Sequence, residues 1–266
     1  MDVSSNSDFT KNFVQITNKW SEIGMKCCEN QCINTNKHIG NCIEGNGFVN
    51  IICDENVKYI HCKEGKGCFD KVGCVTSRNK FNKPKEDCLN YSLFYFEIKC
   101  KIENIKRGGN CLGIGLSNGY NVIQLFIDSA HICNAIETRF IDFKLPKTFS
   151  WNDGDIFGCG LVYPPTNNVN KFPYVFFTQN GKQIGKSVLV REDIGAGYAI
   201  GAGLRRCSIE ANFGNDLKTK PFIYNITEHS VSKEFYINSE GLMTLLPLVN
   251  FRKFLITKKH LKNLLK

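Results

Sequence analysis

The chain has 266 residues, enough for one large all-β domain or two small ones. Hydrophobic residues make up 42% and charged residues 22% of the sequence, a balance that excludes a wholly disordered chain. The formal net charge of +9, from 34 basic and 25 acidic residues, permits anionic partners without requiring them.

No apolar run reaches the roughly 18 residues of a transmembrane helix, so we expect none. The first residues, Met1 to Asn6, lack a basic stretch followed by an apolar one, and we expect no cleaved secretory signal. A cytoplasmic location is the expectation, with secretion kept open as the alternative.

Cysteine is the one unusual residue count. Eight of the 14 cysteines lie between Cys27 and Cys74. A disulfide framework needs an oxidising compartment, which the missing signal argues against. Cys28 and Cys32 form an acceptable half-site for zinc, but no second pair matches it. We favour free, partly buried thiols and expect no metal or cofactor, with structural zinc and disulfides as alternatives.

The first 56 residues predict a short irregular region rich in cysteine and asparagine. Residues 8–20 predict a short helix, with Asp8 as a weak N-cap. Further on, Asn, Gly and Cys interrupt short apolar pieces. Phe48 to Ile52 is the clearest of these and predicts a strand after the Gly45-Asn46-Gly47 turn.

The middle of the chain, residues 57–227, predicts one antiparallel β-sandwich. Residues 94–102 alternate strictly, with Phe94 on one face and Glu97 on the other, which is typical of a half-buried strand. Asn180-Gly181 between two apolar runs predicts a hairpin, because both turn positions need a positive φ. Further strands are expected at residues 112–116, 156–163, 174–178, 182–185, 200–202 and 208–213.

Residues 228–266 predict a basic amphipathic segment that includes a C-terminal helix. Pro247 suits a first helical turn. Apolar residues recur at helical spacing at Leu248, Phe251, Leu255, Leu261 and Leu265. The segment carries seven basic and three acidic side chains.

No motif in the sequence indicates catalysis or nucleotide binding. Gly181 to Ser187 has three residues between its glycines, where a phosphate-binding loop needs four. Asp153 and Asp155 lie in a turn, where aspartates cap backbone amides. None of the five histidines lies in a recognisable Cys–His signature, so we expect no enzymatic activity.

Five blocks of the sequence resemble, in order, those of the SPRY domain, the core of the B30.2 module. Tyr95 to Lys99 resembles the family's early YFEVK strand, and Gly113 to Leu116 its VGL strand. Asp153 to Gly160 resembles GDVIGCG, and Val175 to Gly185 resembles VFFTKNGKxLG. Asn212 to Gly214 with Lys220 to Phe222 resembles the closing block. The Cys- and Asn-rich first residues are most similar to the expanded SPRY sets of plant-parasitic nematodes.

This resemblance implies a bent antiparallel β-sandwich of the concanavalin-like jelly-roll type that binds a short peptide segment of a partner protein through loops at one edge. It implies no cofactor and no chemistry. Its binding loops correspond to the loop after Leu116, with Tyr120 and Asn121, and to Leu204, Arg205 and Arg206 before Cys207. Between Asp128 and Phe143 the sequence is unrelated to that of the family, so the partner preferences of known family members are not transferred to this chain.

Two other functions remain open, and both involve residues 228–266. Leu246-Pro247-Leu248 with Phe254-Leu255 resembles the end of a SOCS box, off by one in spacing, which would suit a substrate adaptor of a ubiquitin ligase. A basic amphipathic helix also suits RNA or an anionic membrane. We expect a monomer in either case.

Overall fold

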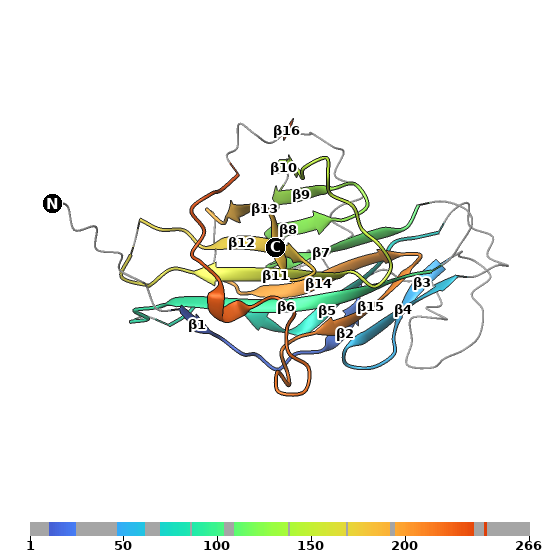
Figure 1. The fold of residues 1–266 in the computed structure, drawn as a ribbon, viewed down its shortest axis with the longest axis horizontal. Helices are drawn as coiled ribbons and strands as arrows, with labels where there is room; N and C mark the ends of the chain where they lie inside the picture. Colours follow the sequence, from blue (N-terminus) through green and yellow to red (C-terminus); the bar gives the residue numbers. More distant parts are fainter. Residues whose placement is uncertain are drawn as a thin grey trace, which may run out of the picture.

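The computed structural model describes residues 11–24, 47–61, 70–85, 87–103, 109–137, 139–168, 170–191, 195–236 and 242–243. These residues form two eight-stranded sheets, with strands that run roughly along the long axis of the molecule (Figure 1). The predicted all-β antiparallel sandwich is thus confirmed. No helix among the described residues is long and apolar enough to cross a membrane.

Sheet 1 has the strand order β13-β12-β11-β6-β15-β4-β3, and β1 pairs with β6 in parallel. Its central strand, β6, runs from Tyr91 to Ile102. The other strands are β1 (Lys11–Phe13), β3 (Gly47–Ile51), β4 (Asn56–His61), β11 (Ile156–Tyr163), β12 (Tyr174–Gln179), β13 (Lys182–Leu189) and β15 (Cys207–Asn212).

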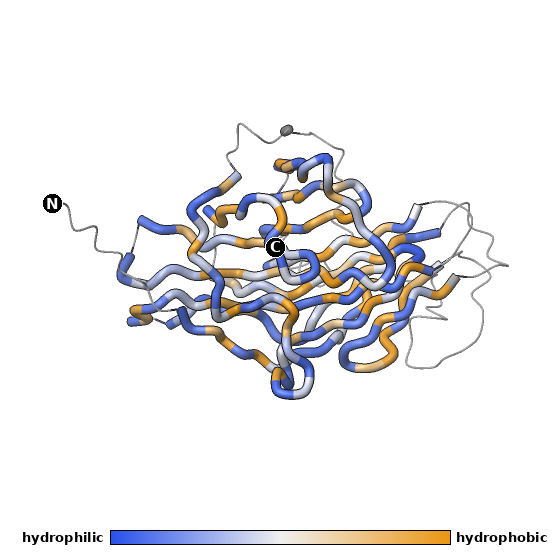
Figure 2. Tube along the Cα trace, viewed as in Figure 1, coloured by the Kyte–Doolittle hydropathy of each residue, from blue (hydrophilic) through white to orange (hydrophobic). Residues whose placement is uncertain are grey.

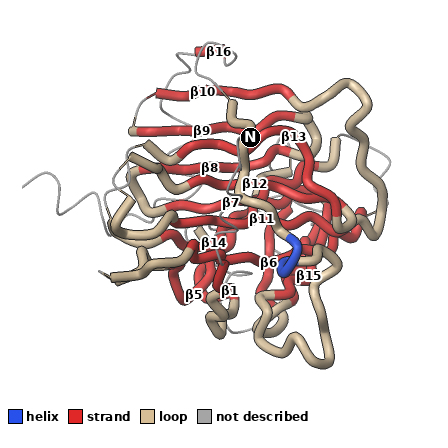
Figure 3. The backbone as a smooth tube through the Cα atoms, turned by 60° about the vertical axis from the view of Figure 1, so that its left-hand side comes forward, coloured by secondary structure: helices blue, strands red, loops and turns tan. Residues whose placement is uncertain are grey.

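Sheet 2 has the strand order β16-β10-β9-β8-β7-β14-β5-β2, and Figure 3 shows β10, β9, β8 and β7 following one another as a ladder. Its strands are β2 (Trp20–Ile23), β5 (Gly73–Phe81), β7 (Cys111–Ser117), β8 (Asn121–Phe126), β9 (His131–Ile136), β10 (Arg139–Lys144), β14 (Tyr198–Arg205) and β16 (Leu242–Met243).

The main core lies between the two sheets, because alternate residues of each strand face inward. Figure 2 shows the resulting mixture of hydrophobic and hydrophilic residues along the strands. Phe94 of β6 stacks on Phe81 of β5 with ring centroids 5.0 Å apart, and Trp20 of β2 meets Phe213 at 5.1 Å. Both ring pairs join the two halves of the sandwich.

A second apolar cluster covers part of the outer face of sheet 1. Residues 221–236, called the C-terminal strap below, cross this face in extended form with one 3₁₀ turn, η1 (Ile226–Glu228). Strap residues such as Phe222 and Phe235 pack on Tyr95 and Tyr174. Glu97 is therefore buried at 3% exposure, and the expectation that it lies on a solvent face is wrong.

The strands predicted around residues 48–52, 94–102, 112–116, 156–163 and 174–185 are confirmed. The Asn180-Gly181 turn has φ values of 49° and 78°, as a two-residue hairpin between Gln179 and Lys182 requires. The predicted helix over residues 8–20 is wrong where the structure describes it. Residues 11–13 and 20 lie in strands, because each pairs with a strand of a sheet.

The strands before residue 57 pair with strands of the predicted 57–227 domain, since β1 joins β6, β2 joins β5 and β3 joins β4. Hydrogen-bonded sheet thus extends across that boundary, and the division into 1–56, 57–227 and 228–266 stays a prediction. The predicted C-terminal helix lies outside the described residues.

Candidate functional site: loops at two ends of the sandwich

The predicted binding residues lie on two loops at opposite ends of the same strand pair. Ser117 of β7 pairs with Ala199 of β14 at one end, and Cys111 pairs with Arg205 at the other. Six residues of strand at about 3.3 Å each separate these ends by about 20 Å. The structure therefore groups Tyr120 with Asn121, and Leu204 with Arg205 and Arg206, but does not bring the two groups together. The expectation that both loops lie at one edge of the sandwich is thus wrong.

The β7–β8 loop is fixed by the side chain of Asn118. Its Oδ1 accepts hydrogen bonds from the backbone N–H of Tyr120 at 3.0 Å and of Asn121 at 2.7 Å. The Tyr120 carbonyl accepts from the N–H of Glu137, which joins this loop to the β9–β10 turn. Tyr120 is half-buried, whereas Asn121 is 0% exposed. Tyr120 can contact a partner directly, and Asn121 can only support the loop from beneath.

The β14–β15 turn is fixed by a buried ion pair. Arg206 has a φ of 58° and its Nε donates to Oδ2 of Asp70, whose side chain is only 2% exposed. The Arg206 carbonyl accepts from the N–H of Glu103 at 3.0 Å. Leu204 is 0% exposed and belongs to the core. Arg205 is half-buried, and its Nε is buried without a hydrogen-bond partner among the described residues.

Two titratable side chains that the sequence did not single out hold the C-terminal strap on sheet 1. Glu97 accepts from the backbone N–H of Tyr224 at 2.9 Å and of Ile223 at 3.0 Å, and from the hydroxyl of Tyr95 at 3.1 Å. Burial raises the pKa of Glu97, and the backbone hydrogen bonds oppose that rise. The carboxylate fixes the start of the strap.

His229 fixes the middle of the strap. Its ring stacks on Phe176 with centroids 4.2 Å apart, and its two nitrogens lie 3.1 Å from the Tyr174 hydroxyl and 2.7 Å from the Tyr224 hydroxyl. Burial, with a smaller contribution from the Lys11 charge, lowers the pKa of His229 to about 4. The ring is therefore neutral at pH 7, with one nitrogen donating and the other accepting. Glu97, beneath the strap, and His229, within it, are both buried and act structurally.

The turn aspartates behave as the sequence predicts. Asp153 Oδ1 accepts from the N–H of Ile102 at 2.7 Å, and Asp155 Oδ2 accepts from the N–H of Asn152 at 2.8 Å. Asp155 thus caps a backbone amide of its own turn, and Asp153 caps the backbone amide at the end of β6.

Most described cysteines are core residues. Cys74, Cys100, Cys111, Cys133, Cys159 and Cys207 are buried. Burial raises the pKa of the Cys74 and Cys159 thiols, so these groups stay protonated at neutral pH. No three His, Cys, Asp or Glu side chains of the described residues are placed to hold a metal ion. The half-site of Cys28 and Cys32 lies outside the described residues.

Comparisons with known proteins find similarity in structure. No family model and no curated protein matches the sequence. A solved human SPRY domain is 20% identical, with 64% of this chain and 97% of that chain covered and a TM-score of 0.44. The SPRY domain of human HERC1 is 12% identical, with 61% and 91% covered and a TM-score of 0.37. Lectin II from Ulex europaeus is 9% identical, with 53% and 82% covered and a TM-score of 0.30.

Proposed function

We propose that this chain is a non-catalytic protein-interaction module of the SPRY type. It binds a short segment of a partner protein through loops at the ends of its sandwich. The proposed contact residues are Tyr120 on the β7–β8 loop and Arg205 on the β14–β15 turn. Asn121 and Leu204 are buried next to them, and Arg206 orders the β14–β15 turn through its ion pair with Asp70. Tyrosine and arginine are the residue types that interfaces favour as anchors.

The observation that carries the proposal is the placement of the five SPRY-like sequence blocks. They fall on β6, β7, β11, the β12–β13 hairpin and the end of β15, in order. The blocks also contact one another: the Tyr95 hydroxyl lies 2.7 Å from Oγ1 of Thr178, and the Tyr95 ring meets Phe222 at 5.0 Å. Blocks one, four and five thus meet at one point of sheet 1, as parts of a single fold pattern would.

The fixed backbone of both loops also supports recognition. A loop that is ordered before binding loses less conformational entropy when the partner arrives. The Asn118 side chain orders one loop, and the Arg206–Asp70 ion pair orders the other. The exposed parts of Tyr120 and Arg205 are therefore presented on rigid supports.

Affinity capture with the full chain tests the proposal. We expect the unsubstituted chain to enrich a small set of proteins in quantitative mass spectrometry. Tyr120→Ala or Arg205→Ala should lose that set, and which of them does so identifies the binding loop. Arg78→Ala is the matched control, because Arg78 is an exposed arginine on β5. All variants must have the same melting temperature as the unsubstituted chain.

Two results would contradict the proposal. If both loop variants retain the same proteins as the control, the assigned loops do not bind. If the full chain enriches no protein at all, the interaction function itself is wrong.

A further inference from the structure

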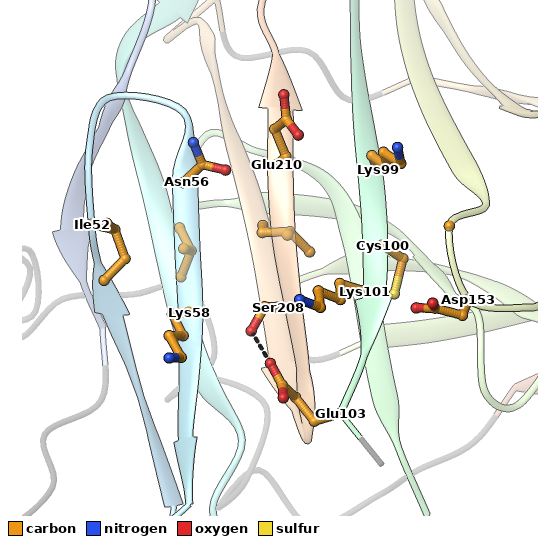
Figure 4. Close-up of a pocket in the computed structure, with 13 residues that line it drawn as sticks. Ile52, Asn56, Lys58, Lys99, Cys100, Lys101, Glu103, Asp153, Ser208 and Glu210 are labelled. Atoms are coloured by element: carbon orange, nitrogen blue, oxygen red, sulfur yellow. Dashed lines mark hydrogen bonds between the residues drawn. The ribbon is translucent and has the colours of Figure 1, made fainter.

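A depression of about 560 Å³ lies on the outer face of sheet 1, beside the area that the C-terminal strap covers. Strands β4, β15 and β6 form its floor, and the turn at Asp153 closes one side (Figure 4). Its lining residue Ser208 follows Arg206 by two positions, so the depression adjoins the β14–β15 turn of the proposed binding site. Its lining carries six charged side chains, three lysines and three carboxylates.

The three carboxylates already have partners within the chain. Glu210 forms an ion pair with Lys220 at 2.7 Å. Glu103 accepts a hydrogen bond from Oγ of Ser208 at 2.7 Å, and Asp153 accepts from the backbone N–H of Ile102. The charge of Glu210 is thus neutralised by Lys220, whereas Glu103 and Asp153 keep their charge and are held in place by neutral donors.

The lysines are not occupied. Lys58, Lys99 and Lys101 are exposed, and none of them makes a hydrogen bond or ion pair with another described residue. Lys58 lies on β4 and Lys101 on β6, the two strands that flank Ser208 of β15 (Figure 4). Two strand spacings put their backbones about 10 Å apart. The depression therefore offers ammonium groups at a defined spacing and no unoccupied carboxylate.

We propose that this depression docks an acidic segment of a protein partner, with carboxylates against Lys58 and Lys101. The inference rests on the proposed interaction function and adds the chemistry of the partner. Alternate residues of an extended peptide lie about 7 Å apart on one side, which the flexible lysine stems can match. Ile52, 52% exposed at the rim, offers contact to one apolar side chain of the same segment.

The interleaved carboxylates favour a peptide over nucleic acid. A nucleic-acid surface needs a continuous positive strip along the phosphates. Glu103 and Asp153 keep their negative charge beside the lysines here, so a polyphosphate chain would find no continuous positive strip. A peptide can place its acidic residues only where the lysines lie.

Fluorescence anisotropy with the full chain tests the proposal. The probe is a fluorescein-labelled library of peptides of about ten residues, with Asp or Glu at alternate positions around one leucine. The reference library carries Asn or Gln at those positions. We expect the acidic library to bind and the reference library not to bind. A double Lys58→Glu, Lys101→Glu variant should weaken binding by about tenfold or more, and added salt should weaken it as well.

The matched control is a double Lys80→Glu, Lys144→Glu variant, which makes the same charge change on exposed lysines of sheet 2. It should retain the binding of the unsubstituted chain. Because Lys58 and Lys101 are exposed and unpaired within the described residues, their double variant should not change the melting temperature. The control loses only an exposed 3.5 Å hydrogen bond from Lys80 to the Ala196 carbonyl, so its melting temperature should not change either.

Three results would overturn the inference: no binding of the acidic library, equal loss in both double variants, or tighter binding of a labelled single-stranded oligonucleotide that depends on Lys58 and Lys101. If affinity capture succeeds while the acidic library fails, the inference falls and the interaction function stands. If both fail, the interaction function falls as well.

Discussion

The stability of the C-terminal strap should depend on pH through His229. Its pKa is lowered from 6.5 to about 4, mainly because its ring is buried against sheet 1. Above pH 6.5 the residue is neutral in both the folded and the unfolded chain, and its full contribution is present. Between pH 6.5 and 4 only the unfolded chain takes up the proton, so the free energy of unfolding decreases as the pH is lowered. Over the whole window the loss is about 3 kcal/mol.

The test substitution is His229→Gln, because the Gln amide keeps one donor and one acceptor for the two tyrosine hydroxyls. It removes the ring stacked on Phe176, which should cost about 1 kcal/mol at every pH. It also removes the titration. The variant should therefore be about 1 kcal/mol less stable than the unsubstituted chain at pH 7. The sign of this difference should reverse as the pH falls, so that near pH 4 the variant is the more stable of the two by about 2 kcal/mol.

The assay is urea unfolding, followed by circular dichroism, at a series of pH values from 7 to 4. Glu97→Gln is the matched control with the opposite sign. In the unsubstituted chain the pKa of Glu97 is raised by burial. Its titration therefore stabilises the folded chain below about pH 4.5, and this stabilisation is lost as the pH rises. Removing Glu97 should make the fall in stability toward acid steeper. A constant difference between His229→Gln and the unsubstituted chain across the series would refute the reasoning.

Three further outcomes are expected. Gly181→Ala should lower the free energy of unfolding by about 1–2 kcal/mol, because φ of Gly181 is 78°. The control Gly109→Ala should change it little, because an added Cβ there meets nothing within 4 Å. Equal melting temperatures of the two variants would contradict this prediction. Arg206→Ala should cost about 3 kcal/mol in urea unfolding, because it strips the arginine from buried Asp70; a cost below 1 kcal/mol would disprove a stabilising pair. A fragment of residues 57–227 should melt below the full chain in circular dichroism, because it loses β1, β2 and β3; an unchanged melt would place the domain boundary as the sequence predicts.

The strands that the sequence predicts are those with aromatic residues in strict alternation or with an unambiguous turn. Successive side chains of β6 alternate between the two faces of the sheet, and Asn180-Gly181 is typical of a two-residue hairpin turn. The missed strands lack such a pattern. β9 places Asn134, between Ile132 and Ile136, on the inner face, where an apolar residue would mark a strand. β5 carries an irregularity in its register with β14, which breaks the alternation.

The candidate site could be predicted only as separate pieces. Tyr120 and Arg205 follow and end strands that the sequence does indicate. Their separation of about 20 Å depends on the register of β7 with β14, a pairing between segments some 80 residues apart that no local pattern encodes. The burial of Asn121 and Leu204 follows from the same packing. The roles of Glu97 and His229 were missed because the strap, which covers Glu97 and contains His229, comes more than 40 residues after β12.

Hydrogen–deuterium exchange of the full chain, alone and bound to a captured partner, tests the central claim most directly. We predict slower exchange on binding at residues 117–121 or 203–208, with little change in the strands of the core. Protection that avoids both loops, or that is confined to residues 244–266, would contradict the account and favour binding through the basic C-terminal segment.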